Sequence, residues 1–595
     1  MVGKIVVSLV SLILLVGVIV GVVVVVNKNG DDNENQSTKV QMKKVHEFCQ
    51  ATEFKDQCAK SLEGVAKNES ATIQDYLMAA FNNTVEEVKK GLAEARKTSV
   101  NKDSDPYNHM AVDDCKQFLQ YAIDQLEDAL ELVGETDIES LHEYSYDLLN
   151  WISAVYSYQS ICLDAIDKPE YKSSIENGLK NATQLTNNAI NIVAKMSEML
   201  KSFNIQIPEG LLNNNNSSPH RRLLEYNKVD QDGYPTWFPA ADRKLLEKSS
   251  KGKSKGEKGG AAPGGGPPLP PVGSGPITPH AVVAKDGSGQ FKTVTDAVKA
   301  YPPNHQGRYI IYVKAGVYNE QVLIDKKQPN VFMYGDGIGK SIITCDKSVG
   351  VSKVTTSTSA TVAVISPGFI AKGITFRNTA GAAAEQAVAL RISGDRAAVF
   401  DCSMEAFQDT LYYQTYRQFY RNCIISGTLD FIFGMGSAVI QDSEIVLRRP
   451  KATGKNTITA DGRQLASQMG GVVLQNCKIV TDPEFFADRF KFDSYLMRPW
   501  KALSTNVFME CEIGDIIKPE GFMKWDKEEF ENTCEVYEYA NKGPGANSNA
   551  RSKIFKKYKV LSPQEATKYT AGAFLLANEW VPATSAPFYL GLGGK

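Results

Sequence analysis

Four short sequence motifs in the C-terminal half, called the four words below, contain the residue types that can do chemistry. They are QAVALR at 386–391, QDTLY at 408–412, DFIFG at 430–434 and RPW at 498–500. Together they supply two acids, two side-chain amides, a guanidinium and an indole. One carboxylate can attack an acyl carbon, a second can move protons, and amide N–H groups can stabilise an oxyanion. The set indicates transfer of an acyl group.

Other hydrolytic chemistries lack their residues in this region. A Ser-His-Asp or Cys-His arrangement needs a histidine base, and zinc sites are built from histidine and paired cysteines. From residue 306 onward the chain has no histidine and no CxxC pair. All six histidines precede the four words: His46, His109, His142, His220, His280 and His305. We therefore expect acids to move the protons, with no metal and no cofactor.

The two acids of the words are Asp409 and Asp430. Aspartate is most often a turn or capping residue, and that is the alternative interpretation here. However, each of these two borders an apolar, aromatic run, TLYY after Asp409 and FIF after Asp430. An unpaired charge is costly in such surroundings and its pKa is easily shifted, which favours a functional role.

The C-terminal half contains an internal repeat in which a short apolar run turns through a polar residue and Cys or Ser. The first three copies recur at one short, nearly constant spacing, and the later ones at a longer one. Short strands at such periods, with little helix between them, predict a parallel β-helix. An antiparallel sandwich would require hairpin signals, which are few. The copies centre on Cys402, Cys423, Ser443, Cys477 and Cys511.

The period also predicts which side chains meet. The step from Asp409 to Asp430 equals the step from Cys402 to Cys423. The two acids should therefore occupy equivalent places on neighbouring rungs. Gln386 precedes Gln408 by almost the same step and should belong to the next rung. We expect one row of two amides and two acids.

The order and spacing of the four words resemble those of the plant pectin methylesterases (pectinesterases). The resemblance implies a right-handed β-helix and hydrolysis of the methyl esters of pectin. Asp430 would be the nucleophile, and Asp409 would protonate methanol and then activate water. Gln386 and Gln408 would donate to the oxyanion, and Arg498 would orient Asp430.

Substrate contacts also follow from the resemblance. Trp500 would offer its ring to a sugar, and Thr356, in the run T-x-x-S-A-T, would be a further contact. The alternatives are a core position for Trp500 and a structural ion pair for Arg498. Met497 replaces the glycine usual before RPW, and Phe522 stands where many relatives have tryptophan. Neither departure removes a chemical group that the reaction needs.

Two rival functions remain open from sequence. A β-helical glycosidase or lyase that acts on the same polymer would also use paired acids. Alternatively, the protein acts only through its N-terminal half, with an inert enzyme half. Residues 277–595, the predicted catalytic domain, carry 37 basic and 31 acidic side chains within a chain of net charge −2. A mildly basic half suits an acidic polymer and gives no reason to expect nucleic acid as a partner.

Residues 42–204 predict an antiparallel helical bundle. Apolar residues recur at helical spacing between Cys115 and Val133 and again between Ala182 and Leu200. The cysteine arrangement, with WISAVYSYQSICLD around Cys162, resembles the pectin methylesterase inhibitor domain. That resemblance implies the disulfides Cys49–Cys58 and Cys115–Cys162. It also implies that this pro-domain either inhibits or chaperones the enzyme until processing, and that separate inhibitor proteins are further partners.

The N-terminal segment, 1–27, predicts entry into the secretory pathway. Residues 5–26 are an apolar run long enough to span a bilayer, with Lys4 before it. A signal anchor and a cleaved signal peptide are both open, and the anchor is favoured because no small-x-small cleavage site precedes Asn27. We expect final localisation in the cell wall. Six N-x-S/T triplets are possible glycosylation sites: Asn35, Asn68, Asn82, Asn181, Asn215 and Asn216.

Residues 205–276 predict a processing region and linker. The run 249–276 is rich in Lys, Gly and Pro and cannot build a core. Two basic-Leu-Leu tetrads precede it and look like the processing sites of pro-pectinesterases, cut by a subtilisin-like protease; helix ends are the alternative. The tetrads are Arg221-Arg222-Leu223-Leu224 and Arg243-Lys244-Leu245-Leu246.

Overall fold

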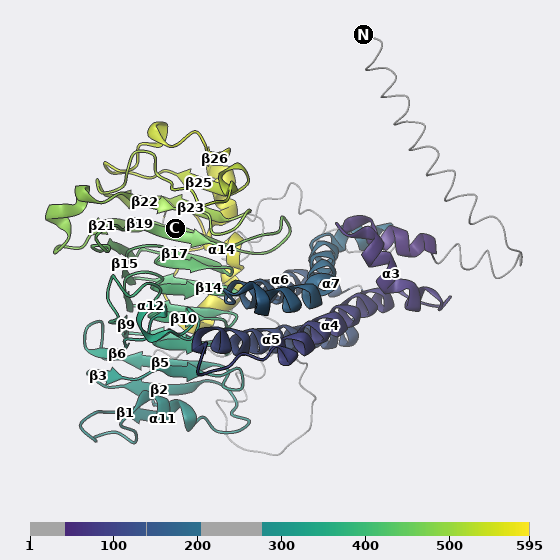
Figure 1. Ribbon diagram of the computed structural model, residues 1–595, viewed down its shortest axis with the longest axis horizontal. Coiled ribbons are helices and arrows are strands. Elements are labelled where there is room, and N and C mark those ends of the chain that lie inside the picture. Colours follow the sequence, from purple (N-terminus) through teal and green to yellow (C-terminus); the bar gives the residue numbers. More distant parts are fainter. Residues whose placement is uncertain (1–41, 139, 204–276, 594–595) are drawn as a thin grey trace, which may run out of the picture.

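The computed structural model describes residues 42–138, 140–203 and 277–593. These residues form a helical bundle and a tall stack of short strands (Figure 1). The apolar run 5–26, both tetrads, and Asn35, Asn215 and Asn216 lie outside the described residues. Within the described ranges, no helix has the length and the apolar character that crossing a bilayer requires.

Four long helices make up most of the bundle, with local sequence signals at their N-termini. Thr72 and Asp75 form a capping box at the start of one helix, and Asp105 caps the next, which has Pro106 at its first position. The helices are α3 (Lys55–Ala66), α4 (Ile73–Lys97), α5 (Pro106–Glu135), α6 (Ser145–Asp164), α7 (Pro169–Ala194) and α8 (Met196–Ser202).

The bundle core follows the two apolar stripes seen in the sequence. Every stripe residue of α5 from Cys115 to Val133 is buried, as are those of α7 and α8 from Ala182 to Leu200. Disulfides join Cys49 to Cys58 and Cys115 to Cys162, the two pairs that the resemblance implies. The second bridge ties α5 to α6.

The strands form three parallel sheets, which confirms the β-helix. The seven-stranded sheet has the order β22 (Ser494–Met497), β19 (Asn456–Asp461), β16 (Ile432–Gly434), β13 (Leu411–Tyr413), β10 (Leu390–Ile392), β7 (Val362–Val364) and β4 (Val322–Ile324). The eight-stranded sheet has the order β24 (Glu512–Ile513), β21 (Lys478–Thr481), β18 (Glu444–Leu447), β15 (Ile424–Gly427), β12 (Ser403–Glu405), β9 (Thr375–Asn378), β6 (Ser341–Cys345) and β3 (Gly316–Asn319).

The third sheet has eleven strands, and short helices pack beside the stack. The strand order is β1 (Ala281–Val283), β2 (Tyr309–Val313), β5 (Val331–Gly335), β8 (Ile370–Lys372), β11 (Ala397–Phe400), β14 (Arg417–Arg421), β17 (Ser437–Gln441), β20 (Gly471–Gln475), β23 (Thr505–Met509), β25 (Glu535–Tyr539) and β26 (Lys557–Val560). The helices are α11 (Val294–Lys299), α12 (Val349–Ser352), α13 (Pro563–Ala566), α14 (Ala571–Leu575) and α15 (Ala577–Trp580).

The sequence repeat marks a short turn between the eleven-stranded and eight-stranded sheets. The polar residue of each copy has a left-handed backbone, a conformation that Asn and Asp tolerate better than most residues. These residues are Asp401, Asn422, Asp442, Asn476 and Glu510, with φ between 47° and 59°. The residue that follows points into the core, where Cys402, Cys423, Cys477 and Cys511 are buried free thiols. The repeat therefore specifies a turn, in which a left-handed polar residue precedes a residue of the core.

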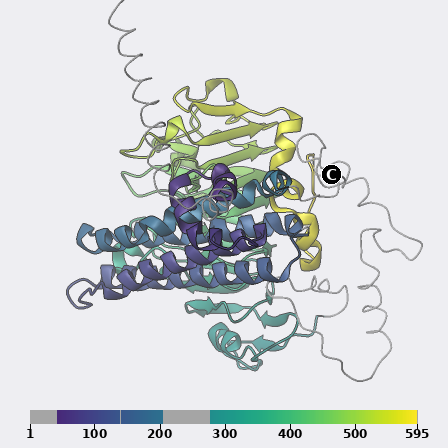
Figure 2. The ribbon, with the colours of Figure 1, turned by 90° about the vertical axis from the view of Figure 1, so that its right-hand side faces the viewer.

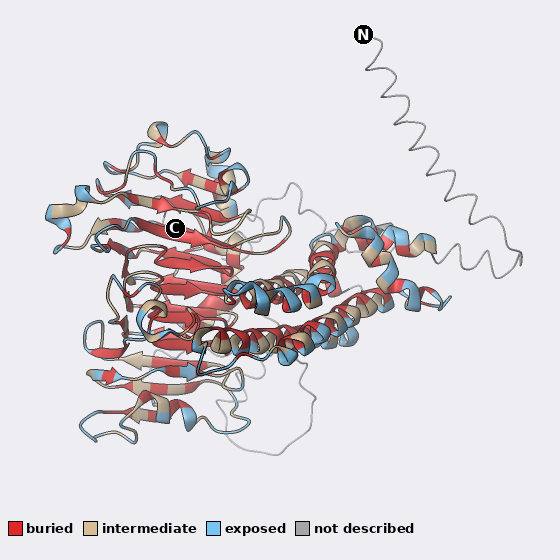
Figure 3. Cartoon of the chain, in the orientation of Figure 1, coloured by how far each residue is buried: buried red, intermediate tan, exposed pale blue. Residues whose placement is uncertain are grey.

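The buried residues form a continuous column through the strand stack (Figure 3). Its apolar cluster runs from Ala281 to Phe555 and contains only residues of the C-terminal half. The bundle lies across one side of the stack, so that α4 to α7 pass in front of the strands when the molecule is turned (Figure 2). Tyr416 and Met435 of the strand half belong to the same buried cluster as the bundle core.

Candidate functional site

Asp409 and Asp430 occupy equivalent positions on neighbouring rungs, as the period predicts. Leu411 of β13 pairs with Ile432 of β16, and each acid lies just before one of these partners at the same offset. Both acids have a left-handed backbone, with φ of 63° for Asp409 and 51° for Asp430. Both side chains are buried. Strained backbone of this kind clusters at functional sites, where the surrounding structure fixes it.

Asp430 is held by two side chains from later rungs. Arg498 grips both carboxylate oxygens, with Nε at 2.8 Å from Oδ1 and Nη2 at 2.5 Å from Oδ2. Thr457, at the start of β19, donates its hydroxyl to Oδ1 at 2.6 Å and accepts the Asp430 backbone N–H at 2.8 Å. A two-pronged guanidinium contact fixes orientation as well as charge. Arg498 and Thr457 therefore fix the orientation of the Asp430 carboxylate.

Arg498 is itself positioned by an aromatic ring. Its guanidinium lies 4.2 Å from the centroid of the half-buried Trp525 ring. Its backbone N–H donates to the Thr459 carbonyl at 3.1 Å, which continues the pairing of β22 with β19. Stacking on an indole face suits a guanidinium. Arg498 therefore belongs to the site, and its ion pair with Asp430 is what the resemblance implies.

Asp409 differs from Asp430 in its surroundings. Burial raises the pKa of Asp409 well above its usual value, and the charge of Asp430 raises it further, while Arg498 offsets part of the increase. A carboxyl group in this environment keeps its proton at a pH where an ordinary aspartate loses it. The site thus combines an acid that can donate a proton with a neighbouring carboxylate in an ion pair.

Aromatic side chains form the surface beside the acids. The rings of Tyr412 and Phe433 stack with centroids 4.2 Å apart, and the Trp500 ring meets Phe433 edge-on at 6.1 Å. Trp500 is half-buried and packs against this cluster. Flat apolar rings of this kind can bind a sugar ring through its apolar face.

The remaining predicted residues lie on the same side of the stack. Ala387 donates its backbone N–H to the Gln408 carbonyl at 3.2 Å, which places Gln386 and Gln408 on adjacent rungs. Both glutamines are half-buried, as is Thr356. Neighbouring Thr355 donates its hydroxyl to Asp114 of the bundle.

The bundle packs directly onto this surface. Trp500 and Leu465 pack against the apolar cluster that the bundle core forms together with Tyr416 and Met435. Lys501 forms an ion pair with Asp164 at the end of α6, at 2.8 Å. Gln464 donates to the Ser160 hydroxyl at 2.7 Å. A bound polymer and the docked bundle would therefore compete for the same surface.

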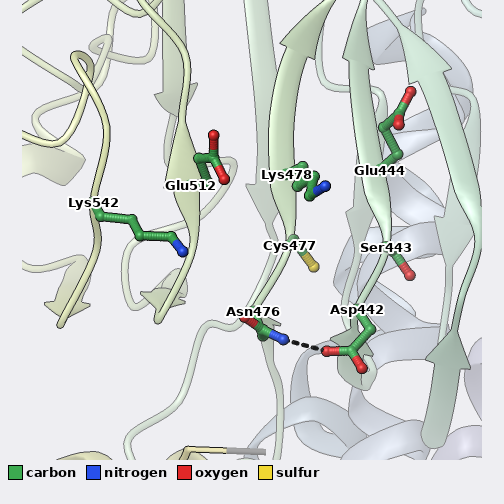
Figure 4. A pocket seen from close by; sticks show the side chains of 8 residues that line it. All are labelled: Asp442, Ser443, Glu444, Asn476, Cys477, Lys478, Glu512 and Lys542. Atoms are coloured by element: carbon green, nitrogen blue, oxygen red, sulfur yellow. Dashed lines mark hydrogen bonds between the residues drawn. The ribbon is translucent and has the colours of Figure 1, made fainter.

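A separate pocket lies away from the four words (Figure 4). It crosses the eight-stranded sheet, where Glu444, Lys478 and Glu512 stand in register on β18, β21 and β24. Asn476 donates to Asp442 at its edge, at 2.6 Å. Asp409, Asp430, Arg498 and Trp500 are not among its lining residues, so this pocket is not part of the site.

Sequence reasoning missed Thr457 and Trp525. Neither belongs to one of the four words. Trp525 could have been considered, because it is an aromatic residue only three positions after Phe522, which is already a departure from the family pattern. Thr457 reaches Asp430 only because β19 is the next strand beyond β16. The step along the chain between these two residues is longer than the step from Asp409 to Asp430. Because this step differs from the regular period, the period could not predict that Thr457 lies beside Asp430.

Comparison with known proteins adds to this geometry. The sequence profile of the Pectinesterase family matches residues 280–578, and the profile described as plant invertase/pectin methylesterase inhibitor matches residues 43–192. Pectinesterase 4 of Arabidopsis thaliana is 41% identical over 100% of both chains. A probable pectinesterase/pectinesterase inhibitor of Brassica napus is 40% identical over 99% of this chain and 100% of its own.

Among solved structures, a pectin methylesterase from carrot is 44% identical. The match covers 54% of this chain and 100% of that chain, with a TM-score of 0.52. About half of this chain therefore matches the whole of that solved chain. Because an enzyme profile covers half of the chain and relatives about 40% identical cover all of it, the chain belongs to the pectinesterase family and carries an N-terminal region of the inhibitor type.

Proposed function

We propose that the strand half hydrolyses the methyl esters of pectin (homogalacturonan), releasing methanol and free carboxylates. The observation that carries this proposal is the unequal pair of acids. Asp430 is fixed by Arg498 and Thr457, while burial raises the pKa of Asp409 beside it. A nucleophile and a proton donor one rung apart are the two groups that ester cleavage needs.

The reaction has two halves. An Asp430 oxygen attacks the ester carbonyl carbon, and the carbonyl oxygen takes the negative charge, stabilised by the side-chain amides of Gln386 and Gln408. The C–O bond to the methoxy group breaks as Asp409 gives that oxygen its proton, so methanol leaves and an acyl anhydride with Asp430 remains. Asp409, now ionised, takes a proton from water, which attacks the same carbon and releases Asp430.

Trp500 and Thr356 contact the sugars in this proposal. Trp500 belongs to the ring cluster beside the acids, so a galacturonate ring stacked on it would present its ester to Asp430. Arg498 acts through Asp430 and is a positioning residue.

The bundle keeps the enzyme inactive in the uncut chain. It binds Lys501, next to Trp500, in the structure, and a tether within one chain holds such a contact at a high effective concentration. Release follows cleavage at Leu224 or Leu246 by a subtilisin-like protease. The protein is secreted to the cell wall, with an anchor or signal at residues 5–26 and glycans on the exposed Asn68, Asn82 and Asn181.

Methanol release from esterified pectin tests this proposal. The full chain and the chain cut in the linker are compared for methanol, new reducing ends and unsaturated products. We expect methanol alone, and much more of it from the chain whose halves have been separated. New reducing ends or unsaturated products would establish a glycosidase or a lyase. Absence of all three from the separated strand half would show it to be inert.

A further inference from the structure

Two aspartates of the bundle reach into the surface beside the catalytic acids. Asp114 of α5 accepts hydrogen bonds from two threonine hydroxyls of the strand half, Thr355 and Thr358, the latter at 3.1 Å from Oδ2. Asp164, the last residue of α6, binds the ammonium group of Lys501. Each contact is the kind that a polymer carboxylate would make.

A buried cation lies near the first contact. Arg391, from the word QAVALR, is 8% exposed, and its guanidinium donates to two neutral oxygens, Gln414 Oε1 at 2.7 Å and the Ser357 carbonyl at 3.3 Å. Arg391 lowers the pKa of Asp114 against the larger raising effect of burial. The guanidinium lies 5.4 Å from the centroid of the Phe118 ring, one turn along α5 from Asp114, and is therefore near the carboxylate that the two threonines bind.

The second contact lies at the catalytic end of the surface. Lys501 follows Trp500, and its Nζ is 5.7 Å from the centroid of that ring. Burial raises the pKa of Tyr412, and the charges of Asp164 and Asp409 raise it further. The Tyr412 hydroxyl thus lies within electrostatic range of both the bundle carboxylate and a catalytic acid.

A disulfide holds these two carboxylates in a fixed relation. Cys115 follows Asp114 directly, and Cys162 lies just before Asp164, so the bridge joins α5 and α6 where both acids project. A galacturonan also presents carboxylates at fixed intervals on a stiff chain. The bundle therefore offers a rigid pair of carboxylates to cationic and hydroxyl groups of the enzyme.

Arg417 forms another ion pair between the halves, and this pair has a different character. Arg417 binds Asp147 of the bundle at 2.6 Å, but it also binds Asp395 of its own half at 2.6 Å. Its charge is already neutralised without the bundle, so this contact serves docking. Arg391 and Lys501 have no such arrangement among the contacts described above.

We propose that Asp114 and Asp164 imitate free galacturonate carboxylates, so that Thr355, Thr358 and Arg391 form one carboxylate-binding subsite of the enzyme and Lys501 forms another. This inference rests on the proposed function, because it assumes that pectin is the polymer bound here.

Binding to the separated strand half tests the subsites. The probes are hexagalacturonate and its fully methyl-esterified form, measured by calorimetry with Asp430→Asn so that no ester is consumed. We expect Lys501→Gln to weaken binding of the free hexamer about tenfold, the usual worth of a hydrogen-bonded charge, and to leave the esterified hexamer unchanged. Thr355→Ala combined with Thr358→Val should act in the same direction.

Two controls keep this test decisive. Lys542→Gln removes a lysine from the separate pocket of Figure 4 and should change neither affinity. Lys501→Arg keeps the charge and should retain binding of the free hexamer, which separates loss of charge from misfolding. Equal losses for both hexamers, or none for either, would overturn the subsites.

Competition tests the imitation itself. Added to the strand half, the separated bundle should be displaced by the free hexamer. Bundle carrying Asp114→Asn and Asp164→Asn should bind at least about tenfold more weakly. Asp113→Asn, at an exposed neighbour paired within its own helix with Lys116, should bind as wild type. Simultaneous binding of bundle and hexamer would overturn the inference. Failure of methanol release with these binding results intact would refute only the esterase proposal.

Discussion

The bundle and the β-helix place their functional residues by different rules. In the β-helix, the site is one column of the fold, so the acids take their positions from the same repeat that builds the core. In the bundle, the repeat builds mainly the interior, and most of the polar contacts with the enzyme come from residues of α5 and α6 that lie outside the repeat. A sequence repeat therefore predicts the position of functional residues only where these residues recur with the repeat, as Asp409 and Asp430 do.

The electrostatics of the two halves differ in the same way. Asp409 and Asp430 are buried within their own half and are controlled by its residues, namely Arg498 and Thr457. Asp114 is surrounded only when the other half is present, through Thr355 and Thr358. The surroundings of Asp409 and Asp430 persist when the bundle leaves, as catalysis requires. The surroundings of Asp114 are lost when the bundle leaves, as a reversible contact requires.

The largest effect is expected for a substitution of the nucleophile in the β-helix. Asp430→Asn should lower kcat for methanol release by about 10⁴-fold or more, the scale seen when a covalent nucleophile is removed, because an amide cannot attack the ester. The matched control is Asp401→Asn, which makes the same substitution at a left-handed position of the turn column. Asn422 and Asn476 already occupy that column, so the control should be nearly fully active. Appreciable activity in Asp430→Asn would refute its role.

Asp409→Asn should come next, at about 10²–10⁴-fold, since methanol is a poor leaving group without a proton. In the wild type, burial and Asp430 raise the pKa of Asp409, so its proton is present below that raised pKa and lost above it. The acylation rate should therefore fall as pH rises through the pKa of Asp409. A pH–rate profile of single-turnover methanol release checks this, and an unchanged alkaline limb in Asp409→Asn would contradict it.

Reduction should separate the stabilities of the two halves. The bridge Cys115–Cys162 closes a loop across 47 positions, and its loss should cost the bundle about 4 kcal/mol of unfolding free energy. The β-helix contains only buried free thiols among its described cysteines, so its melting should not change. Calorimetry of the separated halves with and without a reductant measures both. A destabilised strand half would show that its thiols form bridges in solution.

A smaller effect is expected for Arg498→Lys, about 10²-fold in kcat. An ammonium group cannot grip both oxygens of Asp430 and stack on Trp525 as the guanidinium does. Because Arg498 acts through Asp430, KM should change little. Near-normal kcat in the lysine variant would mean that charge alone matters at this position.

Sequence predicted the β-helix, the bundle and the stacking of Asp409 on Asp430, because regular periods fix all three. It did not predict Thr457, which reaches Asp430 across a rung of irregular length. It did not predict Asp114 or Asp164 either. These are polar residues on helix surfaces, and their sequence surroundings match those of any solvated aspartate; only the docked partner distinguishes them.

The constant short turn at the left-handed column has a consequence for how this fold can change. Between β18 and β24, the chain lengthens the loops 448–455, 462–470, 482–493 and 498–504, all at the two edges of the seven-stranded sheet, while the turn opposite keeps its length. Insertions there leave the rungs in register. The surface beside the acids can therefore be rebuilt by grafting the loops 448–455, 462–470 and 482–493 without displacing either carboxylate, whereas the loop 498–504 must keep Arg498, which holds Asp430.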